Sequence, residues 1–264
     1  MKRNILFLAG AAAALLMLAG CFIFPVVEGS GFLTSTSYAL SGFTRVDASY
    51  GFKVSVKPDV VFSVTVISDD NLLEYLDVRQ SNGSLVVSMA PGYNYTRVTL
   101  TAEIHMPVLT GLVLSGASEA RVDPGFPSTP TINLNLSGAS TAEIQTLNCT
   151  SLYIDASGAS KATIGSLSSS SLAAVLSGAS SIEIAGTAGS ETVNASGGSE
   201  ARLIDCTTGQ AAVNISGGSK CWVEISAGGP ISLDASGGSI LYYLGNPIFT
   251  SLTISGGSQI IKVF

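Results

Sequence analysis

The chain has 264 residues, of which 46% are hydrophobic, only 11% are charged and 29 are glycines. This apolar content is too high for an intrinsically disordered protein, and a chain so poor in charge and rich in glycine is untypical of a cytosolic enzyme. The formal net charge is −6. No cluster of Lys and Arg reverses this acidic balance, which excludes nucleic-acid binding.

An export signal opens the chain. Lys2 and Arg3 precede an uninterrupted apolar run at residues 5–18, in the order of a secretory signal peptide. The sequence LAGC at residues 18–21 forms a lipobox, in which small residues precede a cysteine. We therefore expect a lipoprotein signal peptide at residues 1–20 and attachment of diacylglycerol to the Cys21 thiol, which would hold the mature protein on a membrane.

Two alternatives to the lipoprotein stay open. The first is an uncleaved transmembrane anchor, because the apolar stretch extends through Phe24 and about 20 residues span a bilayer. The second is a plain secretory leader, which would release the protein. All three place the chain in the cell envelope or beyond it. Phe22 follows Cys21 where lipoproteins of a Gram-negative inner membrane carry Asp, which indicates the outer membrane for a Gram-negative organism.

The next two segments differ in composition and in the alternation of apolar and polar residues. Residues 21–40 carry Pro25, two glycines and a run of Ser and Thr, which predicts a flexible tether. Residues 41–110 alternate with period two in segments such as FKVSVKP and VFSVTVI, which predicts irregular N-terminal coils of β-strands. The segment DDNLLEYL at residues 69–76 is the single candidate for a helical turn, with Asp69 or Asp70 as its N-cap.

A strict repeat occupies residues 111–264. The tetrapeptide Ser-Gly-Ala/Gly-Ser recurs eight times at intervals of 19 to 22 residues, and a fixed period of this size indicates stacked structural units. The first two residues of the eight motifs are Ser115 and Gly116, Ser137 and Gly138, Ser157 and Gly158, Ser177 and Gly178, Ser196 and Gly197, Ser216 and Gly217, Ser236 and Gly237, and Ser255 and Gly256.

The residues around each motif predict the fold. Positions one and three before the motif and position five after its first Ser are apolar in every repeat, so two short strands with alternate side chains inward flank each motif. Stacked coils of this kind predict an all-β fold, a single-stranded right-handed parallel β-helix (solenoid) with ~20-residue coils. The motif is then a corner, where Gly tolerates unusual dihedrals and Ser hydrogen-bonds the bent backbone.

The sequence also resembles a known family. The recurrent SG[AG]S motifs, the segments FTRVDASYGFKVSV and NLLEYLDVRQSNGSLVVSM, and the segment VTLTAEIHMPVLTGLVLSGAS look like the GIN domain, the putative auto-transporter adhesin head domain. The resemblance covers residues 41–264, nearly all of the mature chain. It implies a β-helix on an exported, often lipid-anchored, bacterial envelope protein, and it brings no catalytic residues with it.

Two outward columns follow from the period. The residues four and six positions after each motif start face outward, and neighbouring coils never place like charges side by side there, which favours in-register stacking. The unlike neighbours are Arg121 with Glu143, Glu183 with Arg202, and Glu200 with Lys220. This pattern supports the register more than it indicates a site.

The remaining polar residues do not form a reactive constellation. Asp155 and Asp234 share an Asx-rich column but lie four coils apart, too far to share a Ca²⁺ ion. The single histidine, His105, makes a His-based metal site improbable. Glu143 and Glu183 lie two coils apart with arginines beyond them, an arrangement poorly suited to glycoside hydrolysis. We therefore expect no catalytic residue, no metal and no cofactor.

One local feature breaks the column rules. Trp222, the only tryptophan, and Tyr242 occupy the outward column on adjacent coils, with Ile240 beside them and Ile261 next in line. Exposed apolar patches mark interfaces, so these residues are a candidate site for a glycan or protein ligand, or for a homo-oligomer through the C-terminal end. Self-association is favoured because open β-helix ends need capping. The alternatives are that the strand QIIKVF covers the patch, or that a register shift turns Trp222 inward.

Three cysteines remain after export. Cys206 and Cys221 are the closest pair in sequence, but both fall in inward columns and resemble small buried hydrophobes. Cys149 lies in the variable part of its repeat. Whether any of them forms a disulfide stays open at this point.

These features predict a non-enzymatic, lipid-anchored β-helix protein of the cell envelope that acts in adhesion, scaffolding or self-association. The alternative is a carbohydrate-binding or carbohydrate-cleaving β-helix protein. An enzyme needs convergent acidic residues, whereas a binding protein needs only the aromatic patch.

Overall fold

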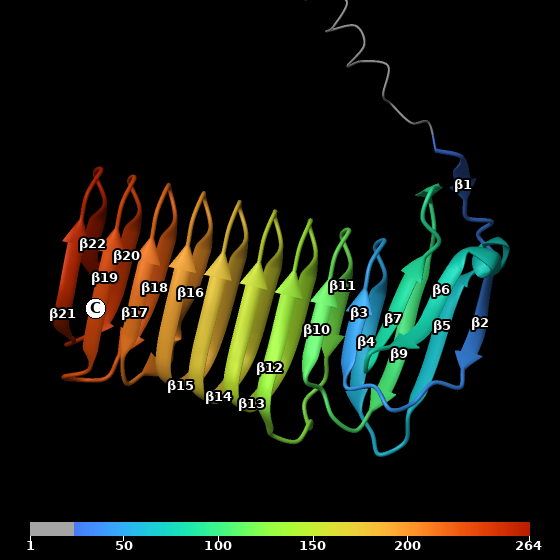
Figure 1. Cartoon of the computed structure of the whole chain (residues 1–264), viewed down its shortest axis with the longest axis horizontal. Coiled ribbons are helices and arrows are strands. Elements are labelled where there is room, and N and C mark those ends of the chain that lie inside the picture. The colour runs from blue at the N-terminus through green and yellow to red at the C-terminus, as the bar shows by residue number, and fades with distance from the viewer. Residues whose placement is uncertain (1–23) are drawn as a thin grey trace, which may run out of the picture.

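The structure is a computed structural model that describes residues 24–264. It is almost entirely β-sheet and forms a solenoid of about eight turns, shown side-on in Figure 1. The predicted all-β parallel β-helix is therefore confirmed. The expected signal peptide and the lipidation site Cys21 lie outside the described residues. Within residues 24–264, no helix is long and apolar enough to cross a membrane.

The N-terminal part combines parallel and antiparallel strands. Strands β3 and β4 pair in parallel with β7 and β9, whereas β2–β5, β5–β9 and β6–β7 pair antiparallel. The antiparallel strands β5 and β2 form this end of the solenoid, and β2 is the outermost strand (Figure 1). In chain order the elements are β1 (Val26–Glu28), β2 (Leu33–Tyr38), β3 (Arg45–Ala48), β4 (Lys53–Pro58), β5 (Ser63–Asp69), the 3₁₀ helix η2 (Asp70–Tyr75), β6 (Leu76–Ser81), β7 (Ser84–Met89), β8 (Asn94–Thr96) and β9 (Leu100–Met106).

The solenoid proper consists of parallel strands stacked in register. Its elements are β10 (Gly111–Leu114), β11 (Glu119–Val122), β12 (Thr129–Leu136), β13 (Thr141–Ala156), β14 (Lys161–Leu176), β15 (Ser181–Ala195), β16 (Glu200–Thr208), β17 (Ala211–Ile215), β18 (Lys220–Ile225), β19 (Pro230–Ala235), β20 (Ile240–Gly245), β21 (Ile248–Ile254) and β22 (Gln259–Lys262). The long strands β13, β14 and β15 each run from one corner, round a gentle bend, to the next corner. All the sharp corners line up along one edge (Figure 1).

Alternation along the strands fills the core. Every second residue of β13 and β14 on each side of the bend is buried, because period-two side chains alternate between the two faces of a strand. Parallel pairing places Ala142 on Ala162 and Leu152 on Leu172, and these four side chains are at most 1% exposed. The inward columns predicted from the repeat therefore form the continuous core.

The repeated tetrapeptide makes the sharp corner. Gly158 has a φ of +72°, and a Cβ atom there would lie 2.5 Å from the carbonyl oxygen of Gly138 in the preceding coil. Only glycine fits both conditions. The last Ser of a motif is buried: the Ser180 hydroxyl donates to the carbonyl oxygens of Ser177, 2.9 Å away, and Ala156, 3.0 Å away. Ser140 and Ser239 make the same two contacts, so these corners are tied to their own turn and to the coil before them.

The prediction of a flexible tether at residues 21–40 is wrong for its described part. Strand β1 pairs with β8, and β2 pairs antiparallel with β5 along six residues. The Asp69 carboxylate fastens this segment by accepting hydrogen bonds from the backbone N–H groups of Gly31, at 2.7 Å, and Thr99, at 2.8 Å. The Ser/Thr-rich composition is typical of a linker, but Thr also favours strands, and β5 offers an open edge.

Two details of residues 41–110 also differ from expectation. Val46 stacks on Leu112 and Val54 on Ala120, so one regular coil precedes residue 111, with a corner at Tyr50 and Gly51, whose φ values are 59° and 76°. The expected helical turn is present as η2. However, the Asp69 side chain makes no capping hydrogen bond to it, because both carboxylate oxygens bind the N–H groups described above.

Candidate binding surface

The outward columns lie as the period predicted. Parallel pairing aligns the first column from β11 to β22, and the second column runs beside it with one residue between. The first contains Glu119, Thr141, Lys161, Ser181, Glu200, Lys220, Ile240 and Gln259, and the second contains Arg121, Glu143, Thr163, Glu183, Arg202, Trp222, Tyr242 and Ile261.

The expected ion pairs form only in part. The Lys220 ammonium lies 3.6 Å from a Glu200 carboxylate oxygen, as predicted. Arg121 instead pairs with Asp123 of its own coil at 3.7 Å, and Arg202 pairs with Glu200 at 3.8 Å. Residues two apart on one strand share a face, so a long Arg side chain has an acidic partner within its own strand as well as on the next coil.

Trp222 and Tyr242 form an aromatic ladder. Their ring centroids are 4.8 Å apart and their planes are inclined by only 5°. On the preceding coil, the Arg202 guanidinium carbon lies 4.4 Å from the centroid of the Trp222 ring. Both faces of the indole are therefore covered, one by a cation and one by an aromatic ring. The exposed part of the ladder consists of ring edges, which is unfavourable for stacking a sugar ring on Trp222.

The ladder is not covered by the end of the chain. Strand β22 continues the stack, with Ile261 next to Tyr242 in register, and Ile240 lies half-buried beside them. The register also keeps Trp222 in the outward column. Both alternatives considered for this patch, a covering strand and an inward turn of Trp222, are therefore excluded, and all four predicted patch residues lie together on one face.

The last coil exposes side chains that earlier coils bury. Leu252 and Ile254 are 51% and 44% exposed, whereas their partners on the preceding coil, Leu233 and Ala235, are 2% and 0% exposed. Ile248 of the same strand is 59% exposed. Leu252 and Ile254 lie at inward positions of β21, where another coil would cover them, whereas Ile248 stacks on the exposed Pro230. The open end therefore adjoins the aromatic ladder and extends the apolar surface.

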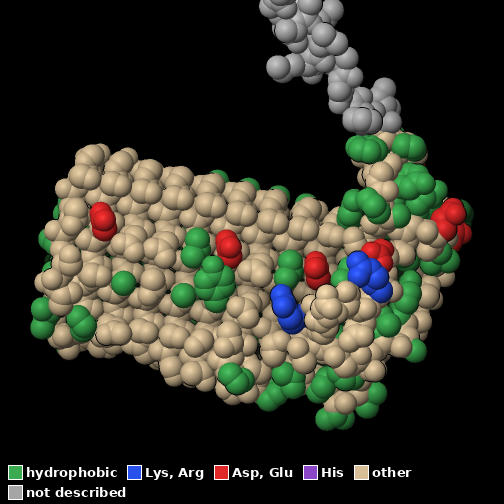
Figure 2. All heavy atoms as spheres, in the orientation of Figure 1, with side chains coloured by type: hydrophobic (Ala, Val, Ile, Leu, Met, Phe, Trp, Pro, Cys, Tyr) green, Lys and Arg blue, Asp and Glu red, His purple; other side chains and the backbone are tan. Residues whose placement is uncertain are grey.

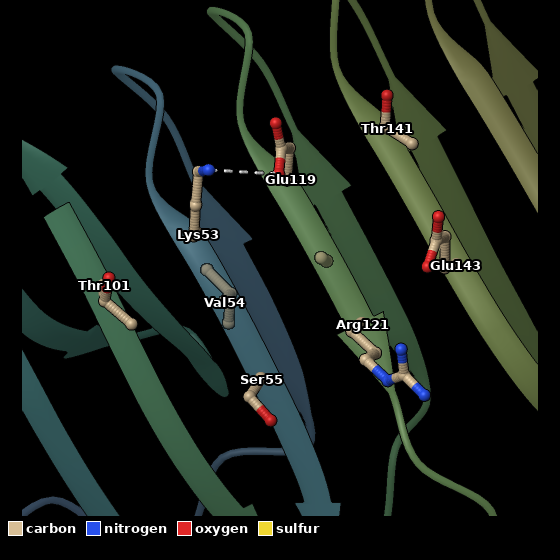
Figure 3. Close-up of a pocket in the computed structure, with 9 residues that line it drawn as sticks. Lys53, Val54, Ser55, Thr101, Glu119, Arg121, Thr141 and Glu143 are labelled. Carbon is tan, nitrogen blue, oxygen red and sulfur yellow. Dashed lines mark ion pairs between the residues drawn. The ribbon is translucent and has the colours of Figure 1, made fainter. Parts of the chain in front are cut away.

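A polar groove lies at the other end of the same face. It has a volume of about 500 Å³ and spans β9, β4, β11 and β13. Lys53 lies 3.8 Å from Glu119 across it, and Arg121 and Glu143 line its lower part (Figure 3). The remaining lining consists of hydroxyl groups from Ser55, Thr101 and Thr141 and of the apolar side chains of Val54 and Ala120. Carboxylates, cations and hydroxyls alternate in this groove, and no aromatic ring lines it.

The acidic residues stay apart, as the spacing indicated. Thr163 separates Glu143 from Glu183 in the column. No group of three or more metal-ligating side chains exists among residues 24–264. In the Asx column, the Asn214 amide donates to the Asn194 carbonyl oxygen at 2.9 Å, so this part of the column is an amide ladder.

One buried acid was missed by the sequence reasoning. Glu191 is 1% exposed, and neither carboxylate oxygen has a hydrogen-bond partner. Burial raises its pKa to about 8, and the neighbouring Cys206 thiol, a weak donor, opposes this rise. Glu191 stacks between Leu172 and Ala211. The signal was available, because the position five before the motif is apolar in the neighbouring repeats.

The three cysteines among residues 24–264 are buried thiols whose raised pKa values disfavour the reactive thiolate. Cys149, Cys206 and Cys221 are free and buried. Burial raises the pKa of Cys149 to about 11 and that of Cys206, which also faces Glu191, to about 12. The pair Cys206–Cys221 is therefore unbridged in this structure, and both residues pack as small hydrophobes, as their columns predicted.

The fold and this surface define a class, the β-solenoid proteins with a charged lateral face and an apolar end. Among solved structures, a putative adhesin from Parabacteroides merdae aligns with a TM-score of 0.84 at 14% identity, over 91% of this chain and 100% of that chain. A putative adhesin from Parabacteroides distasonis aligns with a TM-score of 0.81 at 18% identity, over 90% and 100% of the two chains.

A third structure, titled a putative lipid binding protein from Parabacteroides distasonis, aligns with a TM-score of 0.74 at 19% identity, over 90% of this chain and 100% of that chain. At such identities the likeness establishes the fold. No curated protein matches the chain.

The family follows from the sequence itself. Residues 42–247 match the family described as putative auto-transporter adhesin, head GIN domain, which is more than half of the chain. The chain therefore belongs to this family, and the resemblance seen in the repeated motifs is confirmed.

Proposed function

We propose that the protein is a non-enzymatic adhesin of the cell envelope, anchored by a lipid on Cys21, that contacts its partner through the C-terminal end of the solenoid. The observation that carries this proposal is the uncovered last coil, in which Leu252 and Ile254 are 51% and 44% exposed. The aromatic ladder of Trp222 and Tyr242 borders that coil. Membership of an adhesin-named family supports an adhesive role without catalysis.

The layout of the rod supports this use of the last coil. The described chain begins at Phe24, three residues after Cys21, and β1 lies at the opposite end of the solenoid from β21 and β22 (Figure 1). A molecule held by its N-terminus therefore carries its open end away from the point of attachment. A partner on the surface can reach that end without a steric conflict with the membrane.

A second copy of the chain is the first partner that this end fits. A two-fold axis would set β21 antiparallel to its counterpart and continue both sheets, because the outer backbone edge of β21 is unpaired. Residues 246–264 contain one charged side chain, Lys262, so little charge repulsion opposes the contact. A two-fold contact uses the same end of both copies, so it closes at a dimer.

Light scattering of the full chain tests this contact. We expect a dimer for the wild type and a monomer for the double variant Leu252→Asp/Ile254→Asp, because charge at the open end disfavours apolar burial. A matched control is Val60→Asp/Val61→Asp at the other end, where both side chains are also exposed, at 89% and 66%. The control should remain a dimer. An unchanged mass in the Leu252/Ile254 variant would overturn the proposal.

Carbohydrate binding or cleavage in the polar groove is a second candidate. The alternating carboxylates, cations and hydroxyls around Lys53 and Arg121 favour a polar ligand, whereas the covered ring faces of Trp222 disfavour sugar stacking there. A glycan array with the wild type, Lys53→Ala/Arg121→Ala and the control Lys220→Ala separates the candidates. A glycan that binds the wild type and the control, but not the groove variant, would favour this second function.

A further inference from the structure

Four tyrosines cluster at the N-terminal end, outside every site described so far. Tyr50 lies in the corner between β3 and β4, and Tyr75 ends η2. Tyr93 lies in the loop before β8, and Tyr95 lies in β8. The ring centroids of Tyr75 and Tyr93 are 4.9 Å apart, and Tyr95 lies 6.0 Å from Tyr50 and 5.9 Å from Tyr75. We call this set the tyrosine patch.

The patch has a fixed base and an exposed rim. Tyr95 is half-buried, and its hydroxyl donates to the Ala90 carbonyl oxygen at 2.7 Å. Tyr50 and Tyr93 are 41% and 37% exposed, and Val26 of β1 is 63% exposed nearby, since β1 pairs with β8. Tyr75 and Tyr95 thus hold the rim residues in place, and the rim offers aromatic rings with polar tips to the surroundings.

The patch lies where the chain leaves the solenoid. Val26 pairs with Asn94, between the two tyrosines of the β8 region, and Phe24 is the first described residue. Figure 2 shows hydrophobic side chains gathered on this projection. Cys21 is three residues upstream of Phe24, so the attachment point lies at most about 10 Å from Phe24, at ~3.5 Å per residue, and Phe24 is two residues from Val26.

We propose that the tyrosine patch is a membrane-docking surface that inserts into the interface of the bilayer to which the N-terminus is attached. This inference rests on the envelope anchoring in the proposed function, and it holds equally for a lipid or a transmembrane anchor. Tyr is enriched at membrane interfaces because its ring is apolar and its hydroxyl is polar.

The charges around the patch favour insertion by apolar burial over attraction to anionic lipids. Arg97, which directly follows β8, is exposed and pairs with Glu28 at 2.7 Å, while Glu74 next to Tyr75 adds negative charge. The diacylglycerol expected on Cys21 supplies two acyl chains, which hold the chain on a membrane but leave the orientation of the rod open. The tyrosine patch fixes the direction in which the rod leaves the surface.

Fluorescence quenching of the full, lipid-modified chain in phosphatidylcholine vesicles tests the proposal. Trp222 is the only tryptophan, so the variant Trp222→Phe has no tryptophan fluorescence of its own. In that background, Tyr93→Trp places a probe in the patch, and Tyr153→Trp places one on the lateral face. Tyr153 is a matched control because it is also 37% exposed. Lipids brominated near the headgroup should quench most of the emission of the Tyr93→Trp variant and little of that of the Tyr153→Trp variant.

Flotation of the vesicles separates the two levels of the inference. If the chain floats with the vesicles and the two probes are quenched equally, the docking surface is overturned while the anchor stands. If the wild type fails to float, both the anchor and the docking surface are overturned. A further arm raises the salt concentration, which should leave the quenching of the Tyr93→Trp variant by headgroup-level bromine unchanged. Strong salt dependence would contradict insertion by apolar burial.

Discussion

The buried carboxyl of Glu191 makes a quantitative prediction. Its pKa rises from an ordinary value near 4.5 in the unfolded chain to about 8 in the fold, because burial in an apolar column disfavours the charged form more than the weak Cys206 thiol donor favours it. The folded state therefore binds this proton more tightly. Stability is fully retained below pH 4.5, falls as the pH rises toward 8, and is then constant. At ~1.4 kcal/mol per pKa unit, the loss is about 5 kcal/mol.

Replacement of Glu191 by an uncharged isostere removes this dependence. We expect Glu191→Gln to match the wild type near pH 4 and to exceed its free energy of unfolding by several kcal/mol at pH 9. The variant Glu191→Leu restores the side chain found at Leu152 and Leu172 of the same column. The control is Glu183→Gln, an exposed carboxylate on the same strand β15.

Urea denaturation measured at intervals from pH 4 to pH 9 provides the assay, with the difference between variant and wild type as the readout. This difference removes the contribution of the other titrating groups. The reasoning is refuted if the Glu191→Gln and wild-type midpoints keep a constant separation across the pH range. It is also refuted if Glu183→Gln changes the pH dependence as much as Glu191→Gln does.

Two further substitutions test the corner and the N-terminal cap. Gly158→Ala should destabilise the protein by about 2–4 kcal/mol in urea denaturation, because it combines a left-handed backbone with a clash. The control Gly198→Ala, where the nearest atom of another coil is 3.8 Å from the added Cβ, should leave the stability unchanged. Equal effects of the two substitutions would contradict the corner geometry. Asp69→Ala should lower the free energy of unfolding by about 3 kcal/mol, because it leaves two backbone N–H groups unpaired, and it should speed hydrogen exchange in β1 and β2. The control Asp234→Ala removes an exposed side chain and should do neither. Unchanged exchange in β2 would contradict the fastening role of Asp69.

The repeat period predicts most of the solenoid because stacked coils leave little freedom. Once Gly158 is placed over Gly138, the pairing of Ala142 with Ala162 and of Trp222 with Tyr242 follows. A slip of one residue would turn every inward side chain outward. Counting positions from each motif therefore predicts which face individual side chains lie on, including all four residues of the candidate patch.

Features that depend on partners distant in sequence were not predictable in this way. Strand β2 looks like a linker, because its partner β5 begins 25 residues after β2 ends and carries no shared repeat. The contact of Arg202 with the Trp222 ring depends on side-chain rotamers rather than on register. The exposure of Leu252 follows from the missing neighbour of the last coil, although the residue type matches its column.

The most direct test of the proposed end-to-end contact is the length of the assembled particle. Small-angle X-ray scattering of the full chain measures mass and maximum dimension together. We predict a particle of twice the monomer mass whose maximum dimension is nearly twice that of the Leu252→Asp/Ile254→Asp variant. A dimer no longer than the variant, or a wild-type chain that stays monomeric at every concentration, would contradict adhesion through the open end of the solenoid.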